Sequence, residues 1–464
     1  QEVAARLEHV TRIDSAAHRE KSQAISNLEK EIKGSSKQTV IERAAYTWFN
    51  RFCALRFMDV NHYTRMGVVS PAEEFTQPEI LAEAKQGHID DELIDYLDRE
   101  RITGLLAGRM PSSNPQQEAF RMLLVAVCNL HHVRMPFLFQ KIHDYTELLL
   151  PDDLLSENSI LHAVRQALTQ ETCTDVEVIG WLYQFYISEK KDQVFEGLKK
   201  NKKIAPENIP AATQLFTPHW IVRYLVENSL GRLWMLNRPN SRLIEQMDYY
   251  IPPSHEATAN KQVKKDFLKV TSPEEIKICD PACGSGHMLT YAFDLLYAIY
   301  EEEGYDTIEI PRLILENNLY GVEIDERAGE LAAFALFMKA RRKDRRFFKR
   351  AVQPRVCVLK NVFFTPEEIA TYMDVVGRDL FTLDLQKTLH QFEEADNFGS
   401  LIRPALQDID YVHRVLEEKD ISGNWILHET QQKVLRVLDQ AEYLSQRYHV
   451  VIANPPYMGS KGMN

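Results

Sequence analysis

The sequence has few cysteines and no long apolar run. Its six cysteines, among 464 residues, are scattered, without a C-x-x-C pair or a Cys/His spacing typical of a metal site. No apolar stretch approaches the ~18 residues that cross a membrane, and the first residues, QEVAARLEHV, lack a secretory signal pattern. These absences predict a reduced, cytoplasmic protein that binds no metal and does not enter a membrane.

An excess of positive charge is missing as well. The 55 Lys and Arg residues face 67 Asp and Glu residues, which gives a net charge of -12 at pH 7. This sign excludes a protein that coats nucleic acid through its overall charge. Contact with nucleic acid would have to use local basic patches or a part of the protein beyond this sequence. The hydrophobic fraction of 44% is that of an ordinary globular chain, whose length predicts two or three domains.

Residues 1–205 predict a mostly α-helical N-terminal domain. In VAARLEHVTRI, the residues Val3, Leu7, Val10 and Ile13 form one stripe at helical spacing. Further apolar helices are expected up to residue 203, and prolines in a polar stretch from residue 206 predict a break.

Residues 206–464 have a different pattern, in which short β-branched strands alternate with helices. This alternation predicts βαβ units and a parallel sheet, and therefore an α/β fold. A mostly helical insertion is expected at about residues 365–445, between the third and fourth strands.

The stretch ICDPACGSGHML predicts a strand that ends at Asp280, then a turn and a helix. The turn contains Pro281, Ala282, Gly284 and Gly286. Small residues there let a ligand approach the backbone N–H groups at the helix N-terminus. A carboxylate at the strand end would repel a pyrophosphate, but it suits the ammonium and sulfonium groups of S-adenosylmethionine. A tight turn without a ligand is the structural alternative.

Two later strand ends offer further contacts to such a cofactor. Glu323, in LYGVEID, is placed to accept hydrogen bonds from ribose hydroxyls, and Ile324 could pack on an adenine face. Asn361, in VLKNVFF, could accept the adenine amino group, although a plain strand-end cap explains it equally well.

Upstream of these strands, Thr217 and Pro218 predict the start of a helix, with Thr217 as its cap and the proline at the first position. A well-capped helix without a ligand is the simpler interpretation. In the context of the other motifs, the Thr217 side chain can reach a cofactor carboxylate.

The stretch VVIANPPY predicts a fourth strand that ends at Asn454. Pro455 and Pro456 extend the backbone and leave carbonyl groups free to accept hydrogen bonds. The side-chain oxygen of Asn454 and the carbonyl of Pro455 can accept both N–H groups of an exocyclic amine, whose lone pair then faces a methyl sulfonium. Tyr457 can stack on the base that carries this amine. A core tyrosine after a plain strand terminator is the alternative.

In this order, the motifs around Thr217, Asp280, Glu323 and Asn454 resemble those of the gamma group of amino-methyltransferases, which act on adenine N6 in DNA. The resemblance implies a Rossmann-like S-adenosylmethionine-dependent methyltransferase sheet, truncated in this chain. It further implies cofactor and base contacts at Thr217, Asp280, Gly284, Glu323, Ile324, Asn454, Pro455 and Tyr457. Many relatives carry Asp at the position of Asn361. The substrate would be double-stranded DNA with a flipped adenine.

Longer stretches, among them AYTWFNRFCALRFMDVN and NPPYMGSKGMN, resemble the PglX family of type 1 BREX phage-defence systems. This resemblance implies site-specific adenine N6-methylation that marks host DNA, together with other BREX defence proteins as partners. Members of this family are longer and carry a target-recognition region downstream. We therefore expect that region to be absent here and the 464 residues alone to be catalytically incomplete. Phage DNA-mimic inhibitors are a further possible partner of the N-terminal region, which its acidic charge does not favour.

Two basic clusters could contact DNA. The run KARRKDRRFFKR, residues 339–350, follows a helix that leads away from the ligand edge of the sheet, so a solvated turn or a protein contact is favoured. A second cluster precedes the Thr217 helix, and phosphate contact and a solvated helix end are equally good interpretations of it. This second cluster consists of Lys199, Lys200, Lys202 and Lys203.

Two other functions stay open. Asn-Pro-Pro-Tyr also suits the amide of a protein glutamine or an amine of RNA, so an amine methyltransferase of either kind is one alternative. The other is a module that binds the cofactor but is catalytically incomplete.

Overall fold

The computed structural model describes residues 1–12, 14–141, 145–200, 217–252, 267–376, 382–418 and 425–455. Its contacts divide the chain into two compact units. The first comprises Gln1–Ile179 and Arg345–Ala351, and the second comprises Gly180–Asp344 and Val352–Asn464.

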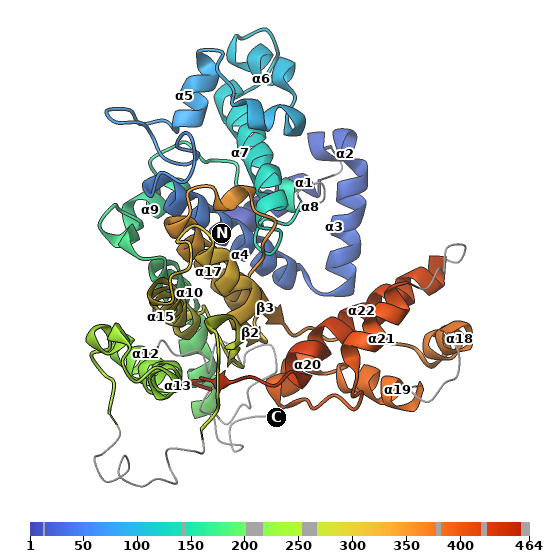
Figure 1. The fold of residues 1–464 in the computed structure, drawn as a ribbon. Coiled ribbons are helices and arrows are strands. Elements are labelled where there is room, and N and C mark those ends of the chain that lie inside the picture. The colour runs from blue at the N-terminus through green and yellow to red at the C-terminus, as the bar shows by residue number, and fades with distance from the viewer. Residues whose placement is uncertain are drawn as a thin grey trace. The chain divides into compact units, whose positions relative to one another are not determined.

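The first unit is built from helices in its described part (Figure 1). They are α1 (Glu2–Val10), α2 (Ala16–Glu20), α3 (Ser22–Gly34), α4 (Lys37–Val60), α5 (Glu79–Lys85), α6 (Arg99–Leu106), α7 (Pro115–Arg134), α8 (Tyr145–Leu148) and α9 (Ile160–Ala167). The stripe predicted on α1 is confirmed, because Val3, Leu7 and Val10 are buried in one core cluster with residues of α3 and α4. Ile13 lies outside the described residues.

Four parallel strands form the sheet of the second unit, in the order β3-β2-β1-β4. The strands are β1 (Ile278–Asp280), β2 (Leu319–Glu323), β3 (Arg355–Val358) and β4 (Val450–Val451). The chain steps outward from β1 to β2 and β3, and then returns to the other side of β1, so the strand order reverses between β1 and β4. Parallel α/β sheets bind ligands outside the carboxyl ends of their strands at such a reversal.

The second unit also contains many helices. Helix α10 (Glu177–Lys199) begins at the end of the first unit and belongs to the second from Gly180 onward. The others are α12 (His219–Val226), α13 (Arg232–Asn237), α15 (His287–Glu302), α16 (Ile310–Leu313), α17 (Glu326–Lys343), α18 (Pro366–Val376), α19 (Thr382–Gln391), α20 (Ala395–Phe398), α21 (Ile409–Glu417) and α22 (Trp425–Ser445).

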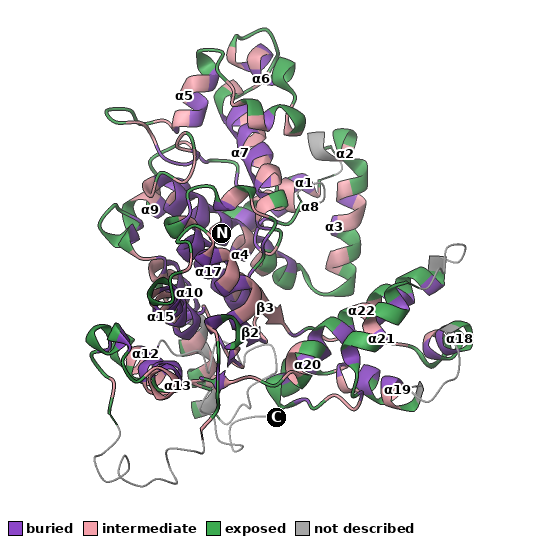
Figure 2. Ribbon diagram, in the orientation of Figure 1, coloured by how far each residue is buried: buried purple, intermediate pink, exposed green. Residues whose placement is uncertain are grey.

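The sheet separates two groups of these helices. Tyr320 and Val322 of β2 belong to a core cluster that includes Leu438 of α22. Gly321 points to the other face, where an added Cβ atom would lie 3.0 Å from Cδ1 of Leu289 on α15. Because successive strand residues face opposite sides, α15 covers one face and the helices between β3 and β4 cover the other. Figure 2 shows α15 and α17 as largely buried, whereas α18 to α22 carry a broad exposed side.

The parallel sheet with its flanking helices confirms the predicted α/β class. The described part of the interval between β3 and β4, where an insertion is expected, contains the helices α18 to α22. The predicted domain limits, residues 1–205 and 206–464, stay predictions.

The basic run at residues 339–350 contacts protein. Lys339 is 9% exposed, and its Nζ donates to Asp294 Oδ2 at 2.8 Å within the second unit. In the first unit, the guanidinium of Arg134 lies over the Phe348 ring, 5.7 Å from its centre. These contacts agree with the protein contact that the sequence favours over a DNA patch.

Candidate active site

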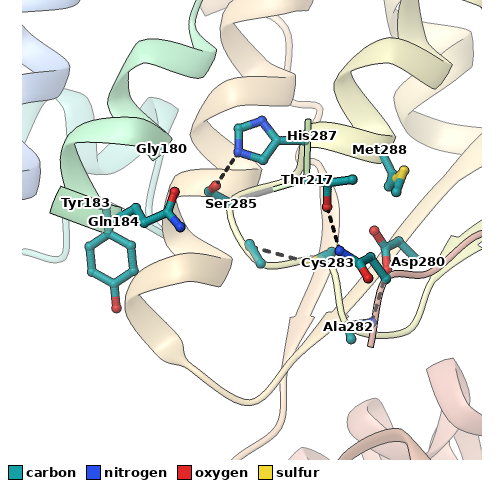
Figure 3. Close-up of a pocket in the computed structure, with 12 residues that line it drawn as sticks. Gly180, Tyr183, Gln184, Thr217, Asp280, Ala282, Cys283, Ser285, His287 and Met288 are labelled. Atoms are coloured by element: carbon teal, nitrogen blue, oxygen red, sulfur yellow. Dashed lines mark hydrogen bonds between the residues drawn. The ribbon is translucent and has the colours of Figure 1, made fainter. Parts of the chain in front are cut away.

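A pocket in the second unit opens at the carboxyl edge of the sheet, where the strand order reverses (Figure 3). It is lined by residues from the turn after β1, the segment before α12, the segment after β4 and one face of α10. Among the residues predicted to form the site, the pocket is lined by Thr217, Asp280, Ala282, Gly284 and Asn454. The topology therefore brings together motifs that are far apart in the sequence.

The turn after β1 depends on two glycines. Gly284 and Gly286 have φ angles of 53° and 90°, a region that side chains with a Cβ atom rarely adopt. At Gly286, an added Cβ would also lie 3.0 Å from the Cβ of Ala332 on α17. Gly286 is the residue that precedes α15, so α15 can begin directly beside the pocket. The first N–H groups of this helix therefore point toward the ligand edge of the sheet.

Asp280 is a buried carboxylate at the floor of the pocket. Only 2% of the residue is exposed, and its Oδ1 accepts a hydrogen bond of 3.1 Å from the Ala282 N–H. Burial raises the pKa of Asp280 to about 7, since the charged form loses its hydration, and the nearby Glu323 carboxylate adds to this rise. A cation in the pocket would stabilise the charged form.

Glu323 ends β2 and supports the turn after β1. Its Oε2 accepts a hydrogen bond of 2.6 Å from Gly284 N, and its Oε1 accepts from the N–H groups of Ile324 and Asp325 at 2.9 and 3.0 Å. Burial raises the pKa of Glu323. Oε2 accepts one of these bonds and Oε1 two, so the second lone pair of Oε2 leaves capacity for a ribose hydroxyl. The predicted ribose contact stays a prediction, whereas the support of the turn is a role that the sequence did not indicate.

Thr217 and Asn454 meet at the pocket through a hydrogen bond. The Asn454 Nδ2 donates to Thr217 Oγ1 at 3.0 Å, a bond drawn as a dashed line at Thr217 in Figure 3. Thr217 was predicted to cap α12, and this prediction is wrong. The cap position is occupied by Pro218, the helix begins at His219, and no side chain caps it. The hydroxyl of Thr217 is therefore available to the pocket.

Helix α10 forms a wall of the pocket that the sequence analysis missed. Gly180, Tyr183 and Gln184 line the pocket, and the Tyr183 hydroxyl donates to Asp325, which follows the end of β2. A Cβ atom at Gly180 would lie 2.6 Å from Ser285 Oγ, so glycine lets the helix approach the Ser285 side chain closely. A glycine inside an apolar helical pattern was the available signal, because it often marks close packing.

Other residues of the turn after β1 also line the pocket. They are Cys283, Ser285, His287 and Met288. The Ser285 Oγ lies 3.0 Å from His287 Nε2, which fixes one side of the turn. None of these four residues was predicted to form the site, although all of them lie within the stretch ICDPACGSGHML.

Two predicted adenine contacts instead touch the insertion. Asn361 follows β3, and its Oδ1 accepts a hydrogen bond of 3.0 Å from the N–H of Asp396 in α20. Ile324 packs against the core cluster of α18 to α22, where an added Cβ at Gly399 would lie 3.3 Å from its Cγ2. Their predicted contacts to adenine stay predictions.

The remaining predicted residues are only partly described. Pro455 is exposed directly after Asn454, whereas Pro456 and Tyr457 lie outside the described residues. Lys199 and Lys200 are exposed at the end of α10, and Lys202 and Lys203 also lie outside the described part. Pro281 continues the chain from Asp280 into the turn.

Among the residues that the structure describes, no group of three or more His, Cys, Asp or Glu side chains is arranged to hold a metal ion. Nor does any helix in the described ranges have the length and apolar character needed to cross a membrane.

Burial raises the pKa of Cys279, beside the pocket, to about 12, so this thiol stays protonated at neutral pH.

The geometry suits a cationic ligand next to a hydrogen-bonded amine. The buried carboxylate of Asp280 attracts positive charge, and the glycine turn leaves room beside the N-terminus of α15. Asn454 adds an amide whose oxygen can accept a hydrogen bond. These features fit the ammonium and sulfonium charges of S-adenosylmethionine and the exocyclic amine of a nucleobase.

Comparisons with known proteins point in the same direction. Residues 317–464 match the family described as Eco57I restriction-modification methylase, and residues 255–361 match the DNA-methyltransferase domain of MmeI. The chain is 41% identical over 468 residues to the adenine-specific methyltransferase BrxX of Escherichia coli O9:H4 (strain HS). It is 36% identical over 469 residues to the adenine-specific methyltransferase PglX of Lacticaseibacillus casei (strain Zhang).

These alignments cover 94% and 93% of the chain, but 37% of each relative. The chain thus spans little more than a third of the length of the two curated relatives. The likeness nevertheless covers more than nine tenths of the chain. Over nearly its whole length, the chain is therefore similar to the adenine-specific methyltransferases BrxX and PglX.

Proposed function

We propose that this chain is part of a site-specific DNA methyltransferase that transfers a methyl group from S-adenosylmethionine to N6 of adenine. The observation that carries the proposal is the meeting of Asn454, Thr217 and Asp280 at one pocket. The names of the two relatives specify adenine, and the MmeI and Eco57I families favour DNA as the substrate.

Asp280 and the glycine turn would hold the cofactor. The charged Asp280 attracts its ammonium and sulfonium groups, and the N–H groups at the start of α15 and the Thr217 hydroxyl suit its carboxylate. Glu323 suits the ribose, and Ile324 and Asn361 suit the adenine. The strand order β3-β2-β1-β4 supports the predicted Rossmann-like arrangement, in which this edge is the ligand edge.

The strand end after β4 would hold the target adenine. When bound, the cofactor supplies an electrophilic methyl group on a positively charged sulfur. Asn454 Oδ1 accepts one N–H of the adenine amine, the Pro455 carbonyl accepts the other, and Tyr457 stacks on the flipped base. Held in this way, the amine would direct its lone pair at the methyl group that the bound cofactor would supply.

The wider role follows the family. We propose that methylation marks host DNA in a BREX phage-defence system, together with other BREX proteins. The exposed Lys199 and Lys200 at the end of α10 are suited to contact the DNA backbone. The net charge of -12 gives no general attraction to DNA.

The test uses the natural full-length protein that contains this chain. S-adenosylmethionine with a radiolabelled methyl group is incubated with the protein and with DNA from cells that lack it. We expect label in N6-methyladenine at one defined sequence. Label in RNA or in a protein glutamine, but not in DNA, would contradict the proposal and favour an amine methyltransferase of another substrate. Cofactor binding without transfer to any of them would favour a binding module.

A further inference from the structure

The side-chain amide of Asn454 has a donor end, Nδ2, and an acceptor end, Oδ1, and the donor end forms a hydrogen bond in the structure. Its Nδ2 donates to Thr217 Oγ1 at 3.0 Å, which leaves Oδ1 as the end that faces other groups. An amide that turned by 180° would present its N–H donors where the acceptor now lies. The orientation of this side chain thus decides whether the pocket offers an acceptor or a donor to an incoming amine.

Thr217 is held in place for this contact. It is 7% exposed and lies directly before α12, while Asn454 follows β4, 237 positions later in the sequence. Its hydroxyl is not used to cap α12, because Pro218 occupies the cap position without any side-chain bond. Both residues line the same pocket as Asp280. The buried Thr217 hydroxyl therefore accepts a hydrogen bond from the Asn454 amide and does not stabilise the start of the helix.

We infer that Thr217 is a positioning residue for Asn454, which keeps the amide oxygen directed at the target amine. This inference rests on the proposed function and extends it. Without the Thr217 hydroxyl, the amide loses the partner of its donor end and can adopt the inverted orientation. An inverted amide would turn its own N–H groups toward the N–H groups of the adenine amine. Two donors cannot form a hydrogen bond with each other, so the amine would be neither held nor aligned for transfer.

The same hydroxyl can connect the two substrates. An Oγ has two lone pairs and one hydrogen, so Thr217 can accept from Asn454 while it donates to the cofactor carboxylate. A bound cofactor would direct the Thr217 hydrogen away from Asn454 and leave the lone pair toward Nδ2. Cofactor binding would then favour the productive amide orientation, and a bound adenine would in turn favour the cofactor.

The test compares Thr217→Val, which keeps the shape but loses the hydroxyl, with Thr217→Ser, which keeps the hydroxyl. In the natural full-length protein, single-turnover methyl transfer to DNA is measured at saturating S-adenosylmethionine, and cofactor affinity is measured separately by calorimetry. We expect Thr217→Val to slow transfer at least about tenfold even at saturation, since an orienting hydrogen bond to a reacting group is lost. Thr217→Ser is expected to stay within about threefold of the natural protein.

The outcomes separate the inference from the function on which it rests. If the Thr217→Val variant transfers the methyl group at the natural rate when S-adenosylmethionine is saturating, Thr217 acts only in cofactor binding. That result would overturn the inference. Thr217→Ser as slow as Thr217→Val would show that the methyl group, not the hydroxyl, matters, and would overturn it too. Absence of transfer to DNA adenine by the natural protein would instead contradict the proposed function. Unfolding midpoints measured beside the rates show whether a slow variant is still folded.

Discussion

At Asp280, the charged form that suits a cationic ligand is the form that lowers the stability of the folded chain. Its raised pKa means that the charged form of Asp280 is less favourable in the folded chain without a ligand than it is in the unfolded chain. The stability that a neutral Asp280 provides at low pH is lost as the pH rises through about 7. We therefore predict that Asp280→Asn raises the free energy of unfolding at pH 8 by on the order of 2 kcal/mol while it abolishes cofactor binding.

Urea denaturation without ligand and calorimetry with S-adenosylmethionine check this prediction. Asp294→Asn, a change of the same kind at a more exposed side chain on α15, is the control that should keep cofactor affinity. A less stable Asp280→Asn protein, or one that still binds the cofactor at the natural affinity, would contradict the assigned role.

The same pKa predicts how cofactor affinity depends on pH. Above about pH 7 Asp280 is charged and attracts the cationic cofactor, and below that pH it is neutral. We expect the affinity to fall about tenfold between pH 8 and pH 6, because only the deprotonated fraction binds well. Asp280→Glu moves the carboxylate but keeps its charge, so the affinity of this variant should still depend on pH. Asp280→Asn has no carboxylate at this position, so its affinity should lack the pH dependence that Asp280 causes. Calorimetry across this pH range measures the effect, and a flat profile for the natural protein would refute it.

At the scale of elements, the close contact of α10 with the turn after β1 shapes the pocket. An alanine at Gly180 would place its Cβ 2.6 Å from Ser285 Oγ and 3.1 Å from Ser285 Cβ, so the Ser285 side chain must turn away and leave His287. We predict that Gly180→Ala weakens cofactor binding on the order of tenfold, because overpacking beside the turn commonly costs about 1–3 kcal/mol.

Gly34→Ala provides a matched control for this change. Gly34 also lies in a helix, α3, but an added Cβ there has nothing within 4 Å. That variant should bind the cofactor as the natural protein does and should be equally or slightly more stable. Unchanged cofactor affinity in Gly180→Ala would mean that α10 does not form a wall of the binding site.

The elements also show which parts of the site a sequence can predict. Asp280 and Glu323 end β1 and β2 as predicted, whereas β4 ends at Val451, three residues before the predicted end at Asn454. Asp280 and Asn454 nevertheless line one pocket, because parallel strands end at one edge of the sheet. The α10 wall was missed because it depends on contacts between residues about a hundred positions apart, and local periodicity carries no such information. The Thr217 cap was wrong for a local reason, since the chain uses Pro218 at the cap instead of the first helical position.

At the scale of the whole molecule, the chain combines a helical first unit with a second unit that contains the sheet and the pocket. Composition and strand alternation predicted the α/β class, but the division at Ile179 follows from packing rather than from a break in the sequence. The likeness to the two curated relatives covers more than nine tenths of the chain and therefore extends over both units.

The central claim is that Asn454 holds an adenine amine for methyl transfer. The most direct measurement is long-read sequencing for N6-methyladenine in cells that carry the natural full-length protein, an Asn454→Ala form or an Asn158→Ala form. Asn158 is exposed in the first unit and serves as the control. We predict methylation at one defined sequence in the natural protein and in Asn158→Ala, and its loss in Asn454→Ala. Unchanged methylation at that sequence in Asn454→Ala would contradict the account.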